Sequence, residues 1–251
     1  MRRIVVLAVI LSTGLATAQI VRLEGPPRIS STDLVAHWRF SEGSGTSVAD
    51  FSGNGNTGTF DGTWTRGKYG NAGSFVAAST QEVTVGDKAT LDMGTGDFSV
   101  AIWAKTSTSA ASILVGKYGS IGYFLGLDAT GKFYGKVRDA STNVSVLGSV
   151  ISDGSWHLLV MTVDRSDAAT GLTLYLDGEY NAHGQQGGGN IDNSDIFYIG
   201  RLASGYYITA EIDDVRIWKR LIGTDEIKRL WSQSSAKCFI DNQSPEGALA
   251  F

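Results

Sequence analysis

Short runs of alternating residues, separated by glycine-rich turns, dominate this chain. The sequence holds 32 glycines and only 3 prolines. Strand-like runs follow one another at roughly ten-residue spacing, which is typical of a β-sandwich. The clearest runs span residues 98–104, 123–127, 132–138, 144–147, 156–163 and 172–176. No helical period of useful length precedes Thr224, so the pattern predicts an antiparallel all-β domain.

Two of these runs also predict where their strands lie in the sheet and how they are connected. Residues 156–163 are apolar at both odd and even positions, which predicts a central strand covered on both faces. Asp177-Gly178 after the 172–176 run is a strong hairpin-turn signal. Large apolar side chains should then be buried between two sheets, and we expect this of Trp38, Phe40, Trp103, Trp156 and Ile217.

The last predicted strand, 211–220, contains the adjacent carboxylates Asp213 and Asp214. A bulge at this pair would place Ile212, Val215 and Ile217 on one face. Burial of unpaired charge is costly, so a cation, an arginine or backbone N–H groups should lie nearby. We expect this partner to come from residues 50–58. His37, in the alternating run 34–40, is expected to face solvent.

The two ends of the chain differ from its middle. Residues 1–18 combine Arg2-Arg3, an apolar stretch and an A-x-A motif, which predicts a signal peptide and a mature chain that begins at Gln19. Residues 19–33 read as a leader or linker, 34–232 as the domain and 233–251 as a tail. Thr224 begins one short helix, with acidic residues in its first turn.

Composition argues against several classes of function. The net charge of −4 argues against binding of nucleic acid or anionic membrane. The single cysteine, Cys238, allows no intrachain disulfide. No segment after the leader is long and apolar enough to span a membrane. The expected location is therefore secreted, periplasmic or extracellular.

The order of several motifs resembles one known family. These motifs are residues 38–45, 50–55, 65–75, 98–103, 156–157, 174–178 and 212–218. Together they resemble a laminin G-like domain of the concanavalin A-like lectin/glucanase superfamily, over about residues 34–232. The resemblance implies an all-β, two-sheet antiparallel jelly-roll sandwich (concanavalin A-like) with one short C-terminal helix. It also implies that the first and last strands lie side by side.

The same resemblance implies a structural Ca²⁺ between the N-terminal region and the last strand. The loop 50–58 is rich in oxygen ligands and glycine, and can curl around a hard cation. Asp50, Asn54 and Asp213 are the candidate ligands. The alternative is free of metal: Asp213 would accept hydrogen bonds from backbone N–H groups of residues 52–55.

Glucanases of this superfamily make hydrolysis the first activity to consider. Glu211-Ile212-Asp213 resembles the start of their Glu-Ile-Asp-x-Glu motif, but Val215, Arg216 and Ile217 leave the second glutamate missing. A retaining glycosidase needs both carboxyl groups. We therefore expect no enzyme activity, and glycoside hydrolysis stands as a distant third hypothesis.

Aromatic residues in glycine-rich segments are candidates for stacking on sugars. They are Tyr206 and Tyr207, the preferred pair, with Trp64, Tyr118 and Tyr69. The leading hypothesis is a secreted, non-catalytic, lectin-like carbohydrate-binding module, possibly with structural calcium. Its partner would be a glycan or a cell-surface or extracellular polysaccharide. The alternative is a structural or adhesive module that binds protein or acts as a spacer.

Overall fold

A computed structural model describes residues 29–202 and 205–236. The expected signal peptide, the cleavage site before Gln19, most of the linker and Cys238 lie outside the described residues. Within the described part of the chain, no helix is long and apolar enough to cross a membrane.

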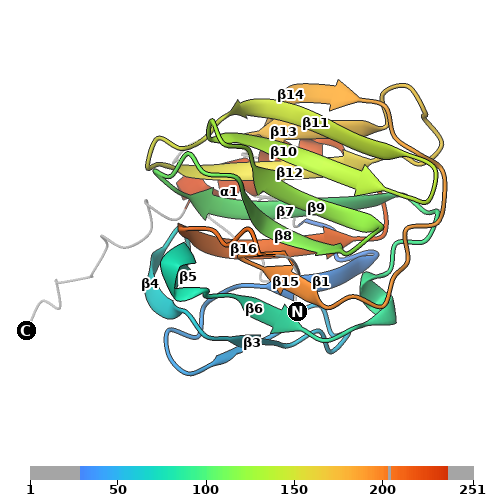
Figure 1. Cartoon of the computed structure of the whole chain (residues 1–251). Helices are drawn as coiled ribbons and strands as arrows, with labels where there is room; N and C mark the ends of the chain where they lie inside the picture. The colour runs from blue at the N-terminus through green and yellow to red at the C-terminus, as the bar shows by residue number, and fades with distance from the viewer. Residues whose placement is uncertain (1–28, 203–204, 237–251) are drawn as a thin grey trace, which may run out of the picture.

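The chain forms two antiparallel sheets packed face to face, each 8-stranded (Figure 1). The back sheet has the order β14-β13-β12-β7-β16-β5-β4, with β1 paired to β16. Its strands are β1 Leu34–Trp38, β4 Thr63–Gly67, β5 Gly70–Phe75, β7 Phe98–Lys105, β12 Trp156–Val163, β13 Leu172–Leu176, β14 Glu179–Gly184 and β16 Ala210–Trp218. The expected two-sheet jelly-roll sandwich is confirmed.

The front sheet, which faces the viewer in Figure 1, has the order β11-β10-β9-β8-β15-β6-β3-β2. Its strands are β2 Ser47–Val48, β3 Gly58–Phe60, β6 Val83–Val85, β8 Ser112–Tyr118, β9 Gly122–Leu127, β10 Lys132–Arg138, β11 Asn143–Val150 and β15 Phe197–Ile199. Two 3-10 turns, Ala77–Ser79 and Ala89–Leu91, flank β6. The expected hairpin turn is present between β13 and β14, where Asp177 and Gly178 have φ values of 54° and 89°.

The first and last strands are neighbours, as the resemblance implied. β1 pairs antiparallel with β16 through Trp38 and Val215, among other pairs. The register of β16 against β7 shifts between Asp213 and Arg216, and Asp214 has a φ of 48°. The expected bulge is therefore confirmed. It places Ile212, Val215 and Ile217 together in the main core.

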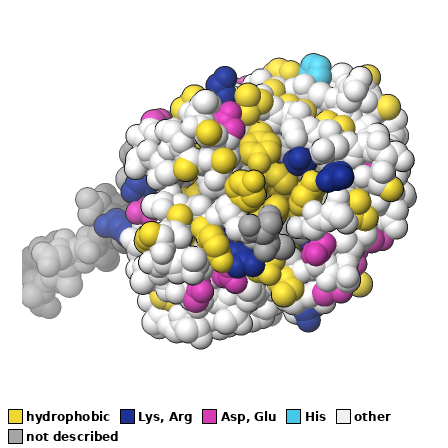
Figure 2. Space-filling model, in the orientation of Figure 1, with side chains coloured by type: hydrophobic (Ala, Val, Ile, Leu, Met, Phe, Trp, Pro, Cys, Tyr) yellow, Lys and Arg dark blue, Asp and Glu magenta, His cyan; other side chains and the backbone are white. Residues whose placement is uncertain are grey.

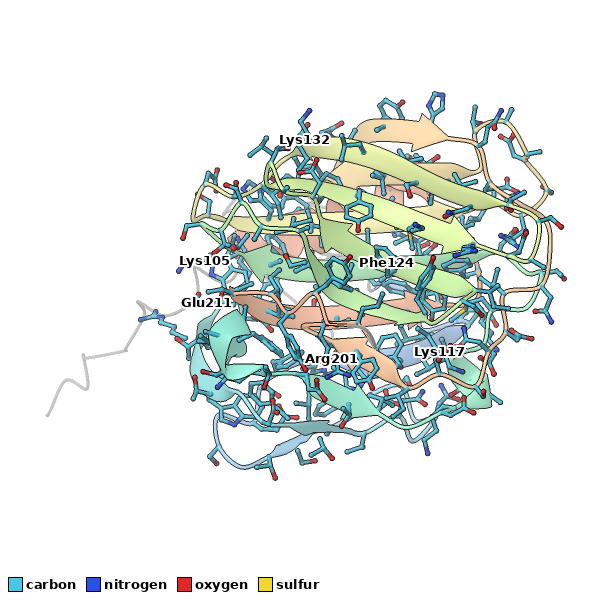
Figure 3. All side chains as sticks on the ribbon, in the orientation of Figure 1. Lys105, Lys117, Phe124, Lys132, Arg201 and Glu211 are labelled. Carbon is cyan, nitrogen blue, oxygen red and sulfur yellow. The ribbon has the colours of Figure 1, made fainter. Side chains whose placement is uncertain are left out.

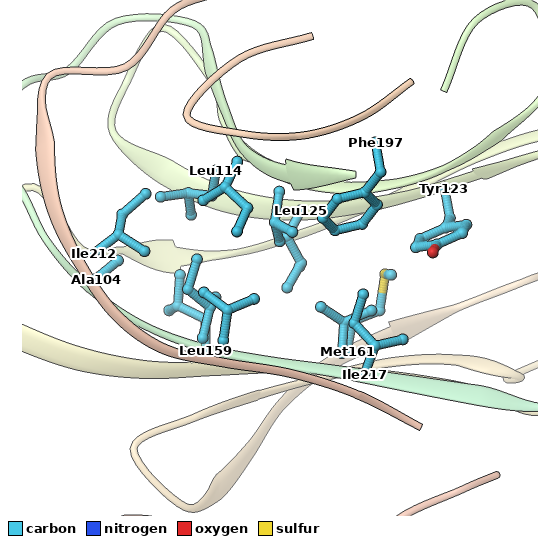
Figure 4. Close-up of a cluster of buried hydrophobic side chains, with 14 of the residues drawn as sticks. Ala104, Leu114, Tyr123, Leu125, Leu159, Met161, Phe197, Ile212 and Ile217 are labelled. Atoms are coloured by element: carbon cyan, nitrogen blue, oxygen red, sulfur yellow. The ribbon is translucent and has the colours of Figure 1, made fainter. Parts of the chain in front are cut away.

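The main core fills the space between the two sheets (Figure 4). Leu114, Leu125 and Phe197 reach it from the front sheet, and Leu159 and Met161 from the back sheet. Each of these side chains is fully buried or nearly so. Burial of one such side chain contributes about 1.5–3 kcal/mol, so the core holds the sandwich together without a disulfide.

A second hydrophobic cluster lies on the outer face of the back sheet, beneath helix α1 Thr224–Ala236. Trp103 is buried there, stacked on Trp231 with ring centroids 5.2 Å apart, and Trp156 is only half-buried. The expectation that Trp103 and Trp156 lie between the sheets is therefore wrong. In a strand that is covered on both faces, both odd and even positions are apolar. The sequence therefore does not show which positions face the other sheet.

Candidate functional site

An aromatic ladder crosses three strands on the outer face of the front sheet. Tyr118 from β8 contacts Phe124 from β9, with centroids 5.1 Å apart and an interplanar angle of 85°. Phe124 in turn contacts Tyr134 from β10 at 5.4 Å and 84°. Edge-to-face contacts of this kind hold each ring in a fixed orientation. The ladder is thus a rigid surface.

Glycines opposite two of the rings make room for this ladder. Phe124 is paired with Gly116 of β8, and Tyr134 with Gly126 of β9. A Cβ at Gly116 would lie 2.4 Å from the Cβ of Phe124, and one at Gly126 would lie 3.3 Å from the ring of Tyr134. A larger side chain at either position would displace a ring.

A fourth aromatic residue, Tyr206, lies near the ladder in the segment that precedes β16, close enough to Tyr134 to raise the pKa of its hydroxyl. The Ile113 backbone N–H donates to the Tyr206 carbonyl at 2.9 Å, which ties this segment to β8. Leu202 packs against Ile113 and Phe124. The Tyr206 side chain is 57% exposed. We name Tyr118, Phe124, Tyr134 and Tyr206 the aromatic face; hydrophobic side chains gather at the middle of this side of the molecule (Figure 2), around the position of Phe124 (Figure 3).

The Tyr134 hydroxyl of this face stays protonated. Burial raises the pKa of Tyr134, and the neighbouring Tyr206 and Tyr118 raise it further. A neutral phenol both donates and accepts a hydrogen bond. The aromatic face therefore offers flat apolar rings with hydrogen-bonding groups at their edges, a combination that suits a sugar ring.

Cations of β10 lie beside these rings. Lys132, Lys136 and Arg138 alternate with buried residues along β10, on the same side as Tyr134. The Lys136 ammonium lies 5.7 Å from the centre of the Tyr118 ring. Arg201 is engaged differently, because Glu82 lies 2.7 Å from its guanidinium and the Tyr207 hydroxyl is a hydrogen-bond partner.

The structure separates the five aromatic residues that the sequence singled out. Tyr206 and Tyr118 belong to the aromatic face, and Tyr207 lies beside it with its hydroxyl on Arg201. Trp64 lies in the back sheet, where its ring packs on Phe60 and its N–H donates to the Gly45 carbonyl.

The fifth, Tyr69, packs against Trp103 on the outer face of the back sheet. Sequence reasoning missed Phe124, Tyr134 and Lys136. Their signal was the alternation in β9 and β10, where residues of one parity are aromatic, basic or glycine.

The candidate calcium ligands Asp50 and Asn54 lie in one loop and are engaged in its turn. Asp50 Oδ1 accepts hydrogen bonds from the backbone N–H groups of His37 and Ser52, at 3.0 and 2.8 Å. Its Oδ2 accepts from the Ser52 hydroxyl and the Asn56 N–H, at 2.8 and 2.9 Å. The Asn54 amide donates to the Leu34 and Val35 carbonyls. These contacts leave the Asp50 oxygens already occupied by donors.

Asp213, the third candidate ligand, is held by a different turn. Its Oδ2 accepts the Tyr69 N–H at 2.8 Å, between β4 and β5. Trp38 of β1 pairs with Val215 on one side and Asp50 on the other. Two strand spacings amount to roughly 9–10 Å, so β1 separates the loop from β16. These residues do not fit one shared calcium site in this arrangement, and calcium binding is left to test by chelation.

The partners of the carboxylate pair differ from those expected from residues 50–58. Asp214 lies 2.7 Å from His37 Nε2 and 2.9 Å from Arg216 Nη2. These partners keep the pKa of Asp214 low although burial opposes this, whereas burial keeps the pKa of His37 low. His37 is therefore not a solvent-facing residue. The His37 ring contacts Asp214 of the neighbouring strand β16. Alternation within β1 alone cannot predict this contact, because it depends on which strand pairs with β1.

The first acidic residue of the glucanase-like tripeptide forms an ion pair. Glu211 lies 3.1 Å from the Lys105 ammonium, at one end of β16. This pair lines a hollow of about 210 Å³ together with Thr106 and Thr209. A second hollow, of about 420 Å³, is lined by Asp92, Asp97, Asp192 and Lys219 among others. Neither hollow includes a residue of the aromatic face.

Comparisons with known proteins identify a family and several solved structures of similar fold. The family model for the concanavalin A-like lectin/glucanases superfamily matches residues 77–228. No curated protein gives a significant match. Among solved structures, the binding domain of Paraclostridial Mosquitocidal Protein 1 has a TM-score of 0.68 at 16% identity, covering 80% of this chain and 52% of that chain.

Two further solved structures are binding domains of Botulinum Neurotoxin DC, one in complex with SialylT and one with rat synaptotagmin II. The first has a TM-score of 0.63 at 12% identity and covers 81% of this chain and 52% of that one. The second has a TM-score of 0.63 at 12% identity, with coverage of 80% and 52%. The chain thus spans about half the length of these chains, and the likeness is one of fold.

Proposed function

The chain belongs to the concanavalin A-like lectin/glucanases superfamily, and from this premise we propose that it is a secreted, non-catalytic module that binds glycans on the aromatic face. A sugar ring has an apolar face of C–H groups and a rim of hydroxyls. The exposed Tyr206 ring and the half-buried rings of Tyr118 and Tyr134 match that arrangement.

The single observation that carries this proposal is the convergence of the four aromatic side chains on one face. They come from β8, β9, β10 and the segment before β16, so the fold assembles them from distant parts of the sequence. Phe124 is 4% exposed and fixes the position of its neighbours. Neither hollow reaches these rings, so the surface suits an extended polysaccharide that lies across it.

Recognition of a protein partner is the second candidate function. Leu147 and Val150 of β11 are 49% and 52% exposed and extend the hydrophobic surface beside β10. Botulinum Neurotoxin DC, which shares the fold, was solved with a protein partner as well as with SialylT. Protein recognition would use this wider surface without requiring the Tyr206 ring.

Glycan-array binding, followed by titration of the best ligand, tests the proposal. Tyr206→Ala should weaken binding roughly tenfold, which corresponds to about 1.4 kcal/mol. Tyr180→Ala is the matched control, because Tyr180 is also 57% exposed but lies on β14 of the back sheet. It should leave binding unchanged.

Two results would contradict the proposal. Glycan binding that is equal in wild type and Tyr206→Ala, or absent from the whole array, would remove the aromatic face as a sugar site. Release of reducing sugar from a bound polysaccharide by the wild-type protein would contradict the non-catalytic assignment.

A further inference from the structure

Basic side chains of β10 lie beside the aromatic face in a protein whose net charge is −4. Residues two apart on a strand lie roughly 7 Å apart on the same face, so Lys136 and Arg138 are close neighbours. In Figure 2, dark-blue side chains lie next to the hydrophobic centre of this side of the molecule.

The strands on either side supply no opposite charge to this pair. Lys136 faces Ser145 of β11 and Phe124 of β9. Arg138 faces Asn143 and Gly122. Among the described residues, no carboxylate forms an ion pair with Lys136 or Arg138.

Other cations of the front sheet are already compensated. Lys117 lies against Asp87 and Asp92, and Arg201 against Glu82. Lys132 donates its backbone N–H to Asp128, whose charge lies close to it. Like charges roughly 7 Å apart repel each other, so Lys136 and Arg138 contribute no stability by lying together without a counter-charge.

We propose that the glycan bound on the aromatic face is anionic, and that Lys136 and Arg138 bind its carboxylate or sulfate groups while a sugar ring stacks on the tyrosines. This inference rests on the proposed function. The Lys136 ammonium at 5.7 Å from the Tyr118 ring centre lies where an acidic substituent of a stacked sugar can reach it. The guanidinium of Arg138 can bind a carboxylate or sulfate through two parallel hydrogen bonds.

Paired polymers that differ only in charge provide the test. Polygalacturonate is compared with its methyl ester, and dextran sulfate with dextran, by isothermal titration of the wild-type protein. One charged polymer of the two should bind at least roughly tenfold more tightly than its neutral counterpart, and its binding should weaken as salt is raised. The two pairs distinguish a carboxylated ligand from a sulfated one.

The double variant K136Q/R138Q should remove this preference and most of the salt dependence. The matched control is K88Q/R66Q, which makes the same change of charge at exposed positions away from the aromatic face. All four side chains are at least partly exposed, so both variants should keep the wild-type melting temperature.

The outcomes separate this inference from the proposed function. Tight, Tyr206-dependent binding of the neutral polymers without preference for charge would overturn the inference and keep the glycan-binding face. If K136Q/R138Q and K88Q/R66Q lost the same affinity for the charged polymer, net charge alone would explain the loss. That result would also overturn the inference. Charge-dependent binding that is lost in K136Q/R138Q but unaffected by Tyr206→Ala would support the cations as the anion site and overturn the aromatic face.

Discussion

At the residue scale, Asp213 is a fully buried carboxylate with one oxygen satisfied and one not. Oδ2 accepts the Tyr69 N–H, whereas Oδ1 has no hydrogen-bond partner among the described residues. Burial, with a smaller contribution from the charge of Asp214, raises the pKa of Asp213 to about 7. Below about pH 7 the protonated form is therefore favoured in the folded protein, because it avoids an unpaired buried charge.

This gives a pH-dependent stability that can be checked. The pKa of an unfolded aspartate is about 3.9, so between pH 4 and 7 the folded state binds more protons than the unfolded state. The free energy of unfolding should therefore fall as pH rises through this window. Asp213→Asn, which stays neutral, should flatten that dependence and be more stable than wild type at pH 8.

Urea denaturation from pH 4.5 to 8, in buffer with EDTA, measures this effect. The exposed-residue variant Glu179→Gln serves as the control and should keep the wild-type profile. A wild-type free energy of unfolding that is flat over the whole range would show that the folded protein accommodates the Asp213 charge.

At the element scale, several hydrogen bonds hold the loop after β2 to β1, and the Asp50 carboxylate accepts one from β1 and others from the loop itself. Asp50 accepts hydrogen bonds from backbone N–H groups of both segments, and the Phe51 N–H donates to the His37 carbonyl at 2.8 Å. A carboxylate that caps several N–H groups performs the bridging that a cation would otherwise perform. These hydrogen bonds close the loop onto β1.

Chelation separates this arrangement from a calcium site. Since the carboxylate oxygens of Asp50 are occupied by N–H and hydroxyl donors, EDTA should leave the melting temperature of the wild-type protein unchanged. Asp50→Ala should destabilise the fold by roughly 2–4 kcal/mol, because the part-buried donors lose a charged acceptor. Asp50→Asn, which retains one acceptor oxygen, should lose less.

Differential scanning calorimetry with EDTA and with added Ca²⁺ makes both measurements. A bound ion would stabilise only the folded state. Recovery of the melting temperature by Ca²⁺ after EDTA treatment, abolished in Asp50→Ala, would restore the calcium hypothesis.

At the scale of the whole molecule, charge is divided between regions of the surface. Unpaired cations lie on β10 next to the aromatic face, while Asp92, Asp97 and Asp192 line the larger hollow. If the ligand is the anionic glycan proposed above, Lys136 and Arg138 would attract its acidic groups toward the aromatic face.

Export is the prediction at this scale. Expressed with its own N-terminus in a host that exports it, the protein should be recovered with Gln19 as the first residue, because residues 16–18 carry the cleavage motif. Intact-mass spectrometry of the exported protein reads this directly. A protein that retains Met1 would contradict the signal-peptide assignment, and a variant with Ala16 and Ala18 replaced by bulky residues should not be cleaved there.

The sequence by itself determined the class of fold and several elements within it. The expected bounds of β10, β12 and β13 agree with the structure, because those runs alternate or are apolar throughout. The bulge in β16 was also predictable, since Ile212 and Val215 can share a face only if one residue is added between them. Short strands such as β2, β3 and β6 carry too few apolar residues to be recognised, and pairing alone defines them.

Only the tertiary structure decided which face of each strand meets which partner. Alternation reports the parity of side chains within one strand, and this is a local property. Whether that parity faces the other sheet, a helix or solvent depends on neighbours far away in sequence. For this reason Trp103 was assigned to the wrong side, and the His37–Asp214 pair was not foreseen. For the same reason the aromatic face exists only in the folded protein, where β8, β9 and β10 bring Tyr118, Phe124 and Tyr134 together.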